Sequence, residues 1–183
     1  MLPQRKFPLA FLAILKSVST TVSFDTKMNV YNALVMSYLN YCSTVSGNIG
    51  KGLSDRIQKL QNRAARILTF ANYETRLSIL LDELFWESLE NKRFKQLAMI
   101  MHKIRNNLSP SYLRRIFTNI SIVHGHNLIN SEINCYVPRP RTECAKGSPH
   151  YRGSVLLNKI PPEIRHLPSL KLFKTSVNGK DYF

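Results

Sequence analysis

Acidic residues are scarce in this 183-residue chain: eleven Asp and Glu stand against twenty-six Lys and Arg, and the formal net charge is +15. Only four of the eleven are aspartates. Two-metal polymerases and nucleases need clustered carboxylates to hold two cations about 4 Å apart. The one adjacent pair, Asp82 and Glu83, falls in an expected amphipathic helix, where a solvated surface is the favoured interpretation. We therefore expect no catalytic residues of this class.

Glycine, cysteine and long apolar runs are also few. Seven glycines disfavour a Gly-rich nucleotide-binding fold, and three cysteines are too few for a disulfide scaffold and favour a reducing compartment. No apolar run reaches the roughly 18 residues of a membrane span. The patterns GxxxxGK[ST], HExxH, GxSxG and CxxC are missing. We expect an intracellular protein, nuclear or cytoplasmic, with no cofactor, small-molecule substrate or membrane partner.

The N-terminus has the outline of a signal peptide. A basic start precedes the mostly apolar residues 7–15, but this stretch is short and contains Pro8. We favour a buried first helix that ends near Lys16. Secretion, with processing near Ser19, is the alternative.

Apolar residues recur at helical spacing through most of residues 1–117. Breaker clusters at 47–52 and 72–74 separate the periodic segments. The pattern predicts helices after an N-cap at Asp25, over 53–70, over 76–85, over 89–107 after a cap at Ser88, and after an N-cap and N1 proline at Ser109-Pro110.

The segment 53–70 carries two stripes. At 100° per residue, a basic stripe lies about 110° round the axis from an apolar one. The apolar stripe, expected to be buried, is Leu53, Ile57, Leu60, Ala64, Ile67 and Leu68. The basic stripe is Arg56, Lys59, Arg63 and Arg66. Cations one turn apart suit contact with phosphates, and a solvated face without a ligand is the alternative.

Residues 118–150 lack helical periodicity, and short strands are possible at 120–123 and 133–137. Two prolines favour an extended backbone over 138–142. An apolar patch after Gly153 leads to a last helix that Ser169 could cap. A second candidate set of nucleic-acid contacts, or simply a basic loop, is formed by Arg139, Arg141, Lys146 and Arg152.

Zinc ligands of suitable type occur in this loop-rich region, at His124, His126, Cys135, Cys144 and His150. Structural zinc sites usually bring ligands in close pairs such as CxxC, and here only His124 and His126 are close. We therefore predict no metal site and favour scattered loop histidines with a partly buried thiol.

These patterns together predict a mainly α fold. We expect an irregular bundle of five to seven helices, followed by a loop-rich basic tail with possible short strands. The expected domains are 1–117, an irregular linker at 118–150, and a C-terminal segment at 151–183. Aromatic residues expected to help form the core are Trp86, Phe85, Phe94 and Tyr112.

Several segments together resemble the region downstream of the polymerase palm in non-LTR retrotransposon (LINE, jockey-type) reverse transcriptases. The resemblance is colinear from about Phe7 to Lys174. Its segments are YNALVMSYLNYCS (31–43), LQNRAARILT (60–69), WESLENKR (86–93), LSPSYL (108–113), YRG (151–153) with NKIP (158–161), and FK (173–174). The family often has tryptophan where this chain has Ser46 and Leu157, which suggests a drifting copy.

The resemblance implies a thumb-like helical region that tracks an RNA or RNA–DNA backbone. It covers only the C-terminal part of such a polyprotein, so the family's catalytic aspartates have no counterpart here. Met1 is then expected to be an internal methionine of a truncated reading frame. The alternative is a vestigial or helical protein-interaction domain with no nucleic-acid role.

Overall fold

The computed structural model describes residues 7–41, 43, 50–123 and 134–178. Most of these residues are helical and none of them belongs to a strand, so the expected mainly helical fold is confirmed. Several helices are a single turn long, so the chain is divided more finely than the sequence indicated. None of the described helices is both long and apolar enough to cross a membrane.

The chain forms two compact units. Unit 1 comprises residues 1–43 and 49–89, and unit 2 comprises residues 44–48 and 90–183. The sequence pattern predicts one helical domain over residues 1–117, whereas the boundary between the two units lies at 89/90.

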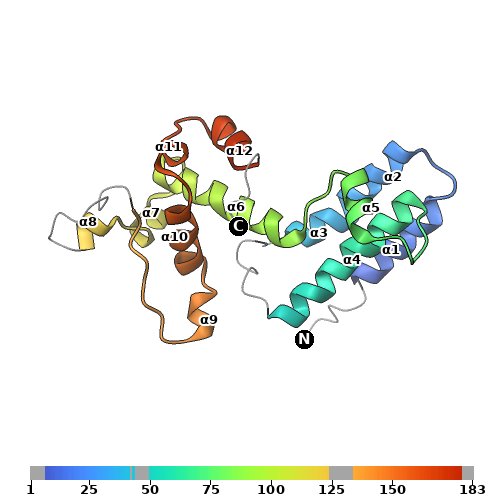
Figure 1. The fold of residues 1–183 in the computed structure, drawn as a ribbon, viewed down its shortest axis with the longest axis horizontal. Helices are drawn as coiled ribbons and strands as arrows, with labels where there is room; N and C mark the ends of the chain where they lie inside the picture. Colours follow the sequence, from blue (N-terminus) through green and yellow to red (C-terminus); the bar gives the residue numbers. More distant parts are fainter. Residues whose placement is uncertain (1–6, 42, 44–49, 124–133, 179–183) are drawn as a thin grey trace. The chain divides into compact units, whose positions relative to one another are not determined.

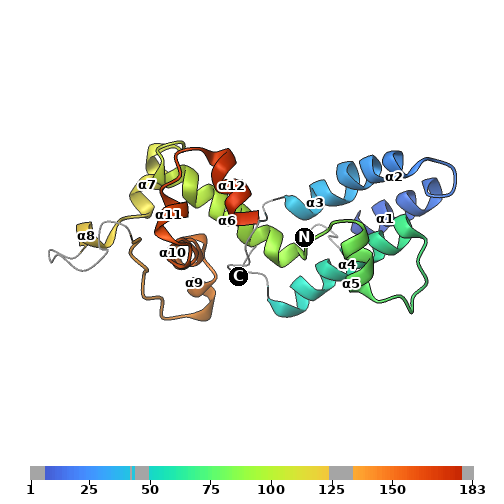
Figure 2. The same cartoon turned by 45° about the horizontal axis from the view of Figure 1, so that its top comes forward.

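Unit 1 is built on two helices that lie side by side, α1 and α4 (Figures 1 and 2). Its elements are α1 (Phe7–Val18), α2 (Phe24–Val30), the π-helical segment η1 (Tyr31–Met36), α3 (Ser37–Asn40), α4 (Lys51–Thr69) and α5 (Leu77–Glu83). The first helix is as expected, and it buries Leu12 and Leu15. The N-cap of α2 is Ser23 and not Asp25, because the Ser23 hydroxyl accepts the Thr26 backbone N–H.

The core of unit 1 surrounds a fully buried Tyr31. Its ring stacks on Trp86 with centroids 4.2 Å apart and an interplanar angle of 19°. Ala64 and Leu68 of α4 pack into the same cluster. Offset aromatic pairs of this kind add to the free energy of area burial, so Trp86 ties the segment after α5 to η1.

The buried face of α4 differs from the expected stripe at three positions, one of which is Ala65, a fully buried residue outside that stripe. Leu53 is exposed, because the whole first turn of α4 is open to solvent. Gln61 is buried instead, and its amide is satisfied: Nε2 donates to the Glu87 carbonyl at 3.0 Å, and Oε1 accepts from Gln58 Nε2 at 2.7 Å. Gln58 also accepts the Leu89 N–H at 3.0 Å. A polar ladder therefore joins α4 to the segment leading into the next helix.

Three helices end in the left-handed conformation without glycine. The residues are Phe70, Phe85 and Asn107, with φ of 53°, 52° and 59°. Each is followed by a hydrogen bond that closes the helix end, Ala71 N–H to Arg66 O, Trp86 N–H to Leu81 O and Leu108 N–H to Lys103 O. Asparagine tolerates this conformation, but phenylalanine is strained in it.

Unit 2 consists of one long helix with shorter helices around it. Its elements are α6 (Leu89–Arg105), α7 (Ser111–Ile116), α8 (Ile120–Val123), α9 (Glu143–Lys146), α10 (Pro149–Lys159), α11 (Pro162–Arg165) and α12 (Leu170–Asn178). A close approach fixes α10 on α6: a Cβ on Gly153 would lie 2.6 Å from Met101 Sδ. The buried His102 stacks on Phe173 at 4.2 Å, and its Nε2 lies 2.7 Å from the Leu167 carbonyl oxygen.

Several local predictions in this half of the chain are wrong. The segment 120–123 is helical, and the strand pairing of the described residues around it is limited to an isolated Asn119–Cys135 bridge. The N-cap before α7 is Pro110, one residue later than expected. Phe85 and Tyr112 are exposed, whereas Trp86 and Phe94 pack against core clusters as expected. Each exposed ring lies at a helix end or in a first turn, where little packs over it.

Candidate nucleic-acid interface

The scaffold of the candidate interface is α4, a nineteen-residue helix. Its sequence has no interior proline and no run of β-branched residues, so helix propensity and the apolar stripe agree. The helix packs against α1, α2 and α5. Its opposite face is therefore left for charged side chains.

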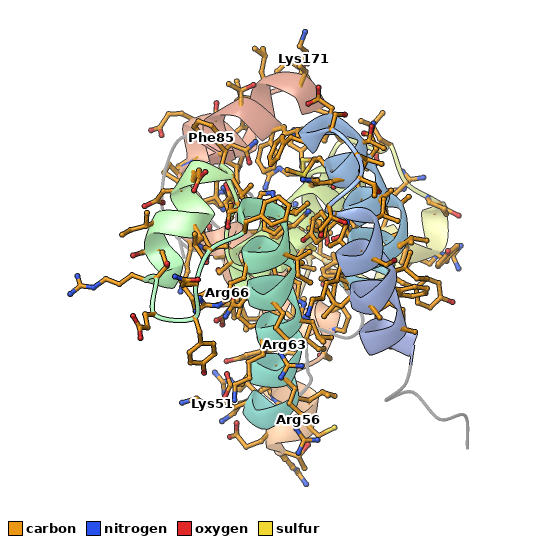
Figure 3. The ribbon with its side chains drawn as sticks, turned by 90° about the vertical axis from the view of Figure 1, so that its right-hand side faces the viewer. Lys51, Arg56, Arg63, Arg66, Phe85 and Lys171 are labelled. Atoms are coloured by element: carbon orange, nitrogen blue, oxygen red, sulfur yellow. The ribbon has the colours of Figure 1, made fainter. Side chains whose placement is uncertain are left out.

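Three cations on this opposite face form what we call the α4 basic row: Arg56, Lys59 and Arg63. All three side chains are exposed. Figure 3 shows Arg56 and Arg63 along α4. No salt bridge joins the row to an acidic group in the described part of the chain, although Asp55 precedes it on the same helix. Like charges three and four residues apart repel each other, so a polyanion would relieve this repulsion.

Arg66, the fourth residue of the predicted stripe, does not belong to the row. Its Nη1 donates to the carbonyl oxygens of Asn72 at 2.9 Å and Thr75 at 3.3 Å. Its guanidinium lies over the Tyr73 ring, 5.0 Å from the centroid. Arg66 therefore holds the loop between α4 and α5, and its charge is only partly open to solvent.

The second predicted set is not brought together by any contact that the described residues show. Arg139 and Arg141 are exposed in the non-helical segment before α9. Lys146 forms a salt bridge with Glu143, and this hydrogen bond raises the pKa of the Lys146 ammonium group. Arg152 packs over Phe94 at 5.1 Å, where burial lowers the pKa of its guanidinium.

Arg93 of α6 is a buried cation. Burial lowers the pKa of its guanidinium, the nearby charge of Arg152 lowers it further, and Glu90 opposes both effects. Arg93 and Arg152 thus form part of the packed surface of α6 and α10. Sequence periodicity missed this because long arginine stems can be buried along apolar surface.

The zinc hypothesis concerns residues that lie partly outside the description. His124 and His126 are outside the described residues. Among the residues that are described, no group of three His, Cys, Asp or Glu side chains lies close enough to hold a metal ion. Cys135 is buried, which raises the pKa of its thiol, and Cys144 is exposed on α9.

Two aromatic residues beside the α4 basic row were not predicted. Phe70 ends α4 with 61% of its surface exposed, and Tyr73 is 89% exposed in the loop that follows. Lys16 of α1 and Phe70 line the same hollow. The one sequence signal was the missing glycine at the end of α4, where phenylalanine must take a positive φ.

Comparison of the chain with protein-family models, with curated proteins and with solved structures finds no match.

Proposed function

We propose that this chain is a non-catalytic, nucleic-acid-binding helical region, of the kind that its resemblance to the post-palm part of non-LTR retrotransposon reverse transcriptases implies. It would contact RNA or an RNA–DNA duplex through phosphates, without base specificity. The observation that carries the proposal is the α4 basic row, three exposed cations at one-turn spacing with no salt bridge among the described residues.

The net charge of the chain favours nucleic-acid binding over the alternative, a solvated basic face without a ligand. The whole chain carries +15, so a polyanion is attracted from a distance as well as at contact. Each phosphate neutralised by a Lys or Arg releases condensed counterions from the nucleic acid. Arg139 and Arg141 of the second set are also exposed and would add to this attraction.

The test is the salt dependence of duplex binding. The triple variant Arg56→Gln, Lys59→Gln, Arg63→Gln should reduce the slope of log K against log salt by about 3, because each phosphate contact contributes about −0.9 on a duplex. Binding would be measured by fluorescence anisotropy on a labelled RNA–DNA duplex between roughly 50 and 200 mM salt.

A matched control separates local contact from total charge. Replacing the exposed Lys103, Lys171 and Lys174 of unit 2 by glutamine removes the same three charges. If the row makes the contacts, the row variant loses more slope than this control. Equal losses, or a slope that neither variant changes, would refute the row as the interface and favour the protein-interaction alternative.

The non-catalytic part of the proposal has its own assay. Primer extension by this chain, on an RNA template with Mg²⁺ and deoxynucleotides, should give no incorporation above background. Incorporation that survives repurification would refute it.

A further inference from the structure

The C-terminal end of α4 presents two aromatic rings, each with a cation on one face. Lys27 Nζ lies 4.2 Å from the centroid of the Phe70 ring, and Arg66 Cζ lies 5.0 Å from that of Tyr73. Phe70 is 61% exposed and Tyr73 is 89% exposed, so each ring keeps a face open to solvent. Each cation contacts one face of its ring, and the other face remains available for stacking.

A hollow of about 380 Å³ lies beside Phe70. Its lining combines apolar groups with cations and hydroxyls and includes no acidic residue: Lys16, Ser19, Thr20, Arg66, Ile67, Phe70 and Ala71. We call this the α4-end hollow. A flat apolar group with a negative charge attached is the ligand chemistry that such a lining favours.

The backbone holds Phe70 in place at a cost. Its φ of 53° is unfavourable for a side chain with a Cβ, and the hydrogen bond from Ala71 N–H to Arg66 O at 3.2 Å locks the turn. A ring held in this way loses little conformational freedom when a ligand stacks on it. The strain by itself points to no ligand; the cations and the hollow around this ring do.

We propose that the α4-end hollow binds an unpaired nucleotide of a single-stranded nucleic acid. A base stacks on the open face of Phe70, a neighbouring base can stack on Tyr73, and Lys16 together with the α4 basic row neutralises the phosphates. This inference rests on the proposed function and makes it specific, because a base inside a duplex has no open face to offer. Stacking of this kind tolerates any base.

A protein ligand is disfavoured by the same lining. A hydrophobic peptide would offer the Lys16 ammonium group no negative charge, whereas a phosphodiester would neutralise it. A phosphate without a base would leave Phe70 in water. Only a nucleotide matches the ring and the cations together.

The experiment compares a double variant and a control variant on three labelled RNAs and one DNA. Phe70→Leu with Tyr73→Leu removes both rings and keeps every charge. Phe85→Leu is the matched control, since Phe85 is also an exposed phenylalanine of positive φ but has no cation contact among the described residues. The probes are a single-stranded 12-mer, an abasic strand of equal length and charge, and a 12-base-pair duplex, with a DNA 12-mer to separate RNA from DNA.

The double variant should bind the single strand about tenfold to a hundredfold more weakly than the wild type, because stacking is lost at one or two bases. Its affinity for the abasic strand and the duplex should change less than twofold, and Phe85→Leu should match the wild type on all three. Equal affinity of the double variant and the wild type for the single strand would overturn the inference while leaving the proposed function intact. No salt-dependent binding by the wild type to any probe would overturn both.

A second measurement needs no variant and so is independent of folding. Ultraviolet irradiation of the wild-type chain with a 5-bromouridine 12-mer should cross-link a peptide containing residues 70–73. Cross-links confined to other peptides would place the bases elsewhere and overturn the inference.

Discussion

Replacing Phe85 by glycine should make unit 1 more stable, although the substitution deletes a whole aromatic ring. Phe85 follows α5 with φ at 52°, and 94% of its surface is exposed. The left-handed conformation costs an ordinary residue about 1–2 kcal/mol. Glycine avoids that cost but loses about 0.5–1 kcal/mol more through its freedom in the unfolded chain. We expect a net gain of about 0.5–1 kcal/mol.

The assay is urea unfolding followed by circular dichroism and by the fluorescence of Trp86, the chain's one tryptophan, which packs in unit 1. With a slope near 2 kcal/mol per molar urea, the midpoint should rise by about 0.3–0.5 M. Phe85→Ala is the control, because it deletes the same ring but keeps the left-handed cost. A glycine variant no more stable than the alanine variant would refute the reasoning.

Three further predictions concern buried positions and use the same unfolding assay. Gln61→Leu should cost about 1–3 kcal/mol, because it removes the buried hydrogen bond to the Glu87 carbonyl and one of the two that Gln58 Nε2 donates, the other going to Asn62; a neutral result would contradict the polar ladder. Tyr31→Phe should be neutral or stabilising by up to about 1 kcal/mol, since the buried hydroxyl has no hydrogen-bond partner among the described residues; a loss above that size would reveal one. Gly153→Val should cost about 1–3 kcal/mol through overpacking against Met101, and the double variant with Met101→Ala should recover part of it.

The periodicity of apolar residues predicts the long helices correctly, because it indicates which face of each helix is buried against the rest of the protein. The segment 53–70 was expected to be helical and α4 spans Lys51–Thr69. The segment 89–107 was likewise expected, and α6 spans Leu89–Arg105. Periodicity does not report whether a polar side chain finds a partner, so Gln61 in the core and Arg66 on two carbonyls were both missed. Such bonds depend on chain segments that meet only after folding.

The errors in the tail have a different origin. Residues 120–122 alternate apolar and polar side chains as a strand would, but a strand needs a partner along its length. Two backbone hydrogen bonds, Ile120 N–H to Asn134 O and Tyr136 N–H to Thr118 O, flank the single bridge. With pairing this short, the local helical conformation is favoured over a strand.

A comparison of Phe70 with Phe85 distinguishes the effect of backbone strain from that of a binding site. Both are exposed phenylalanines with nearly equal positive φ, so both carry the same conformational cost. Among the described residues, Phe70 lies against a lysine and beside a hollow lined by further cations, and Phe85 has no such cation contact. If glycine at position 85 stabilises the fold with no effect on nucleic-acid binding, a poor helix-ending residue by itself has no functional meaning here. If Phe70→Gly also stabilises the fold but weakens single-strand binding, then phenylalanine at the end of α4 lowers the stability of the fold and provides the surface on which a base stacks.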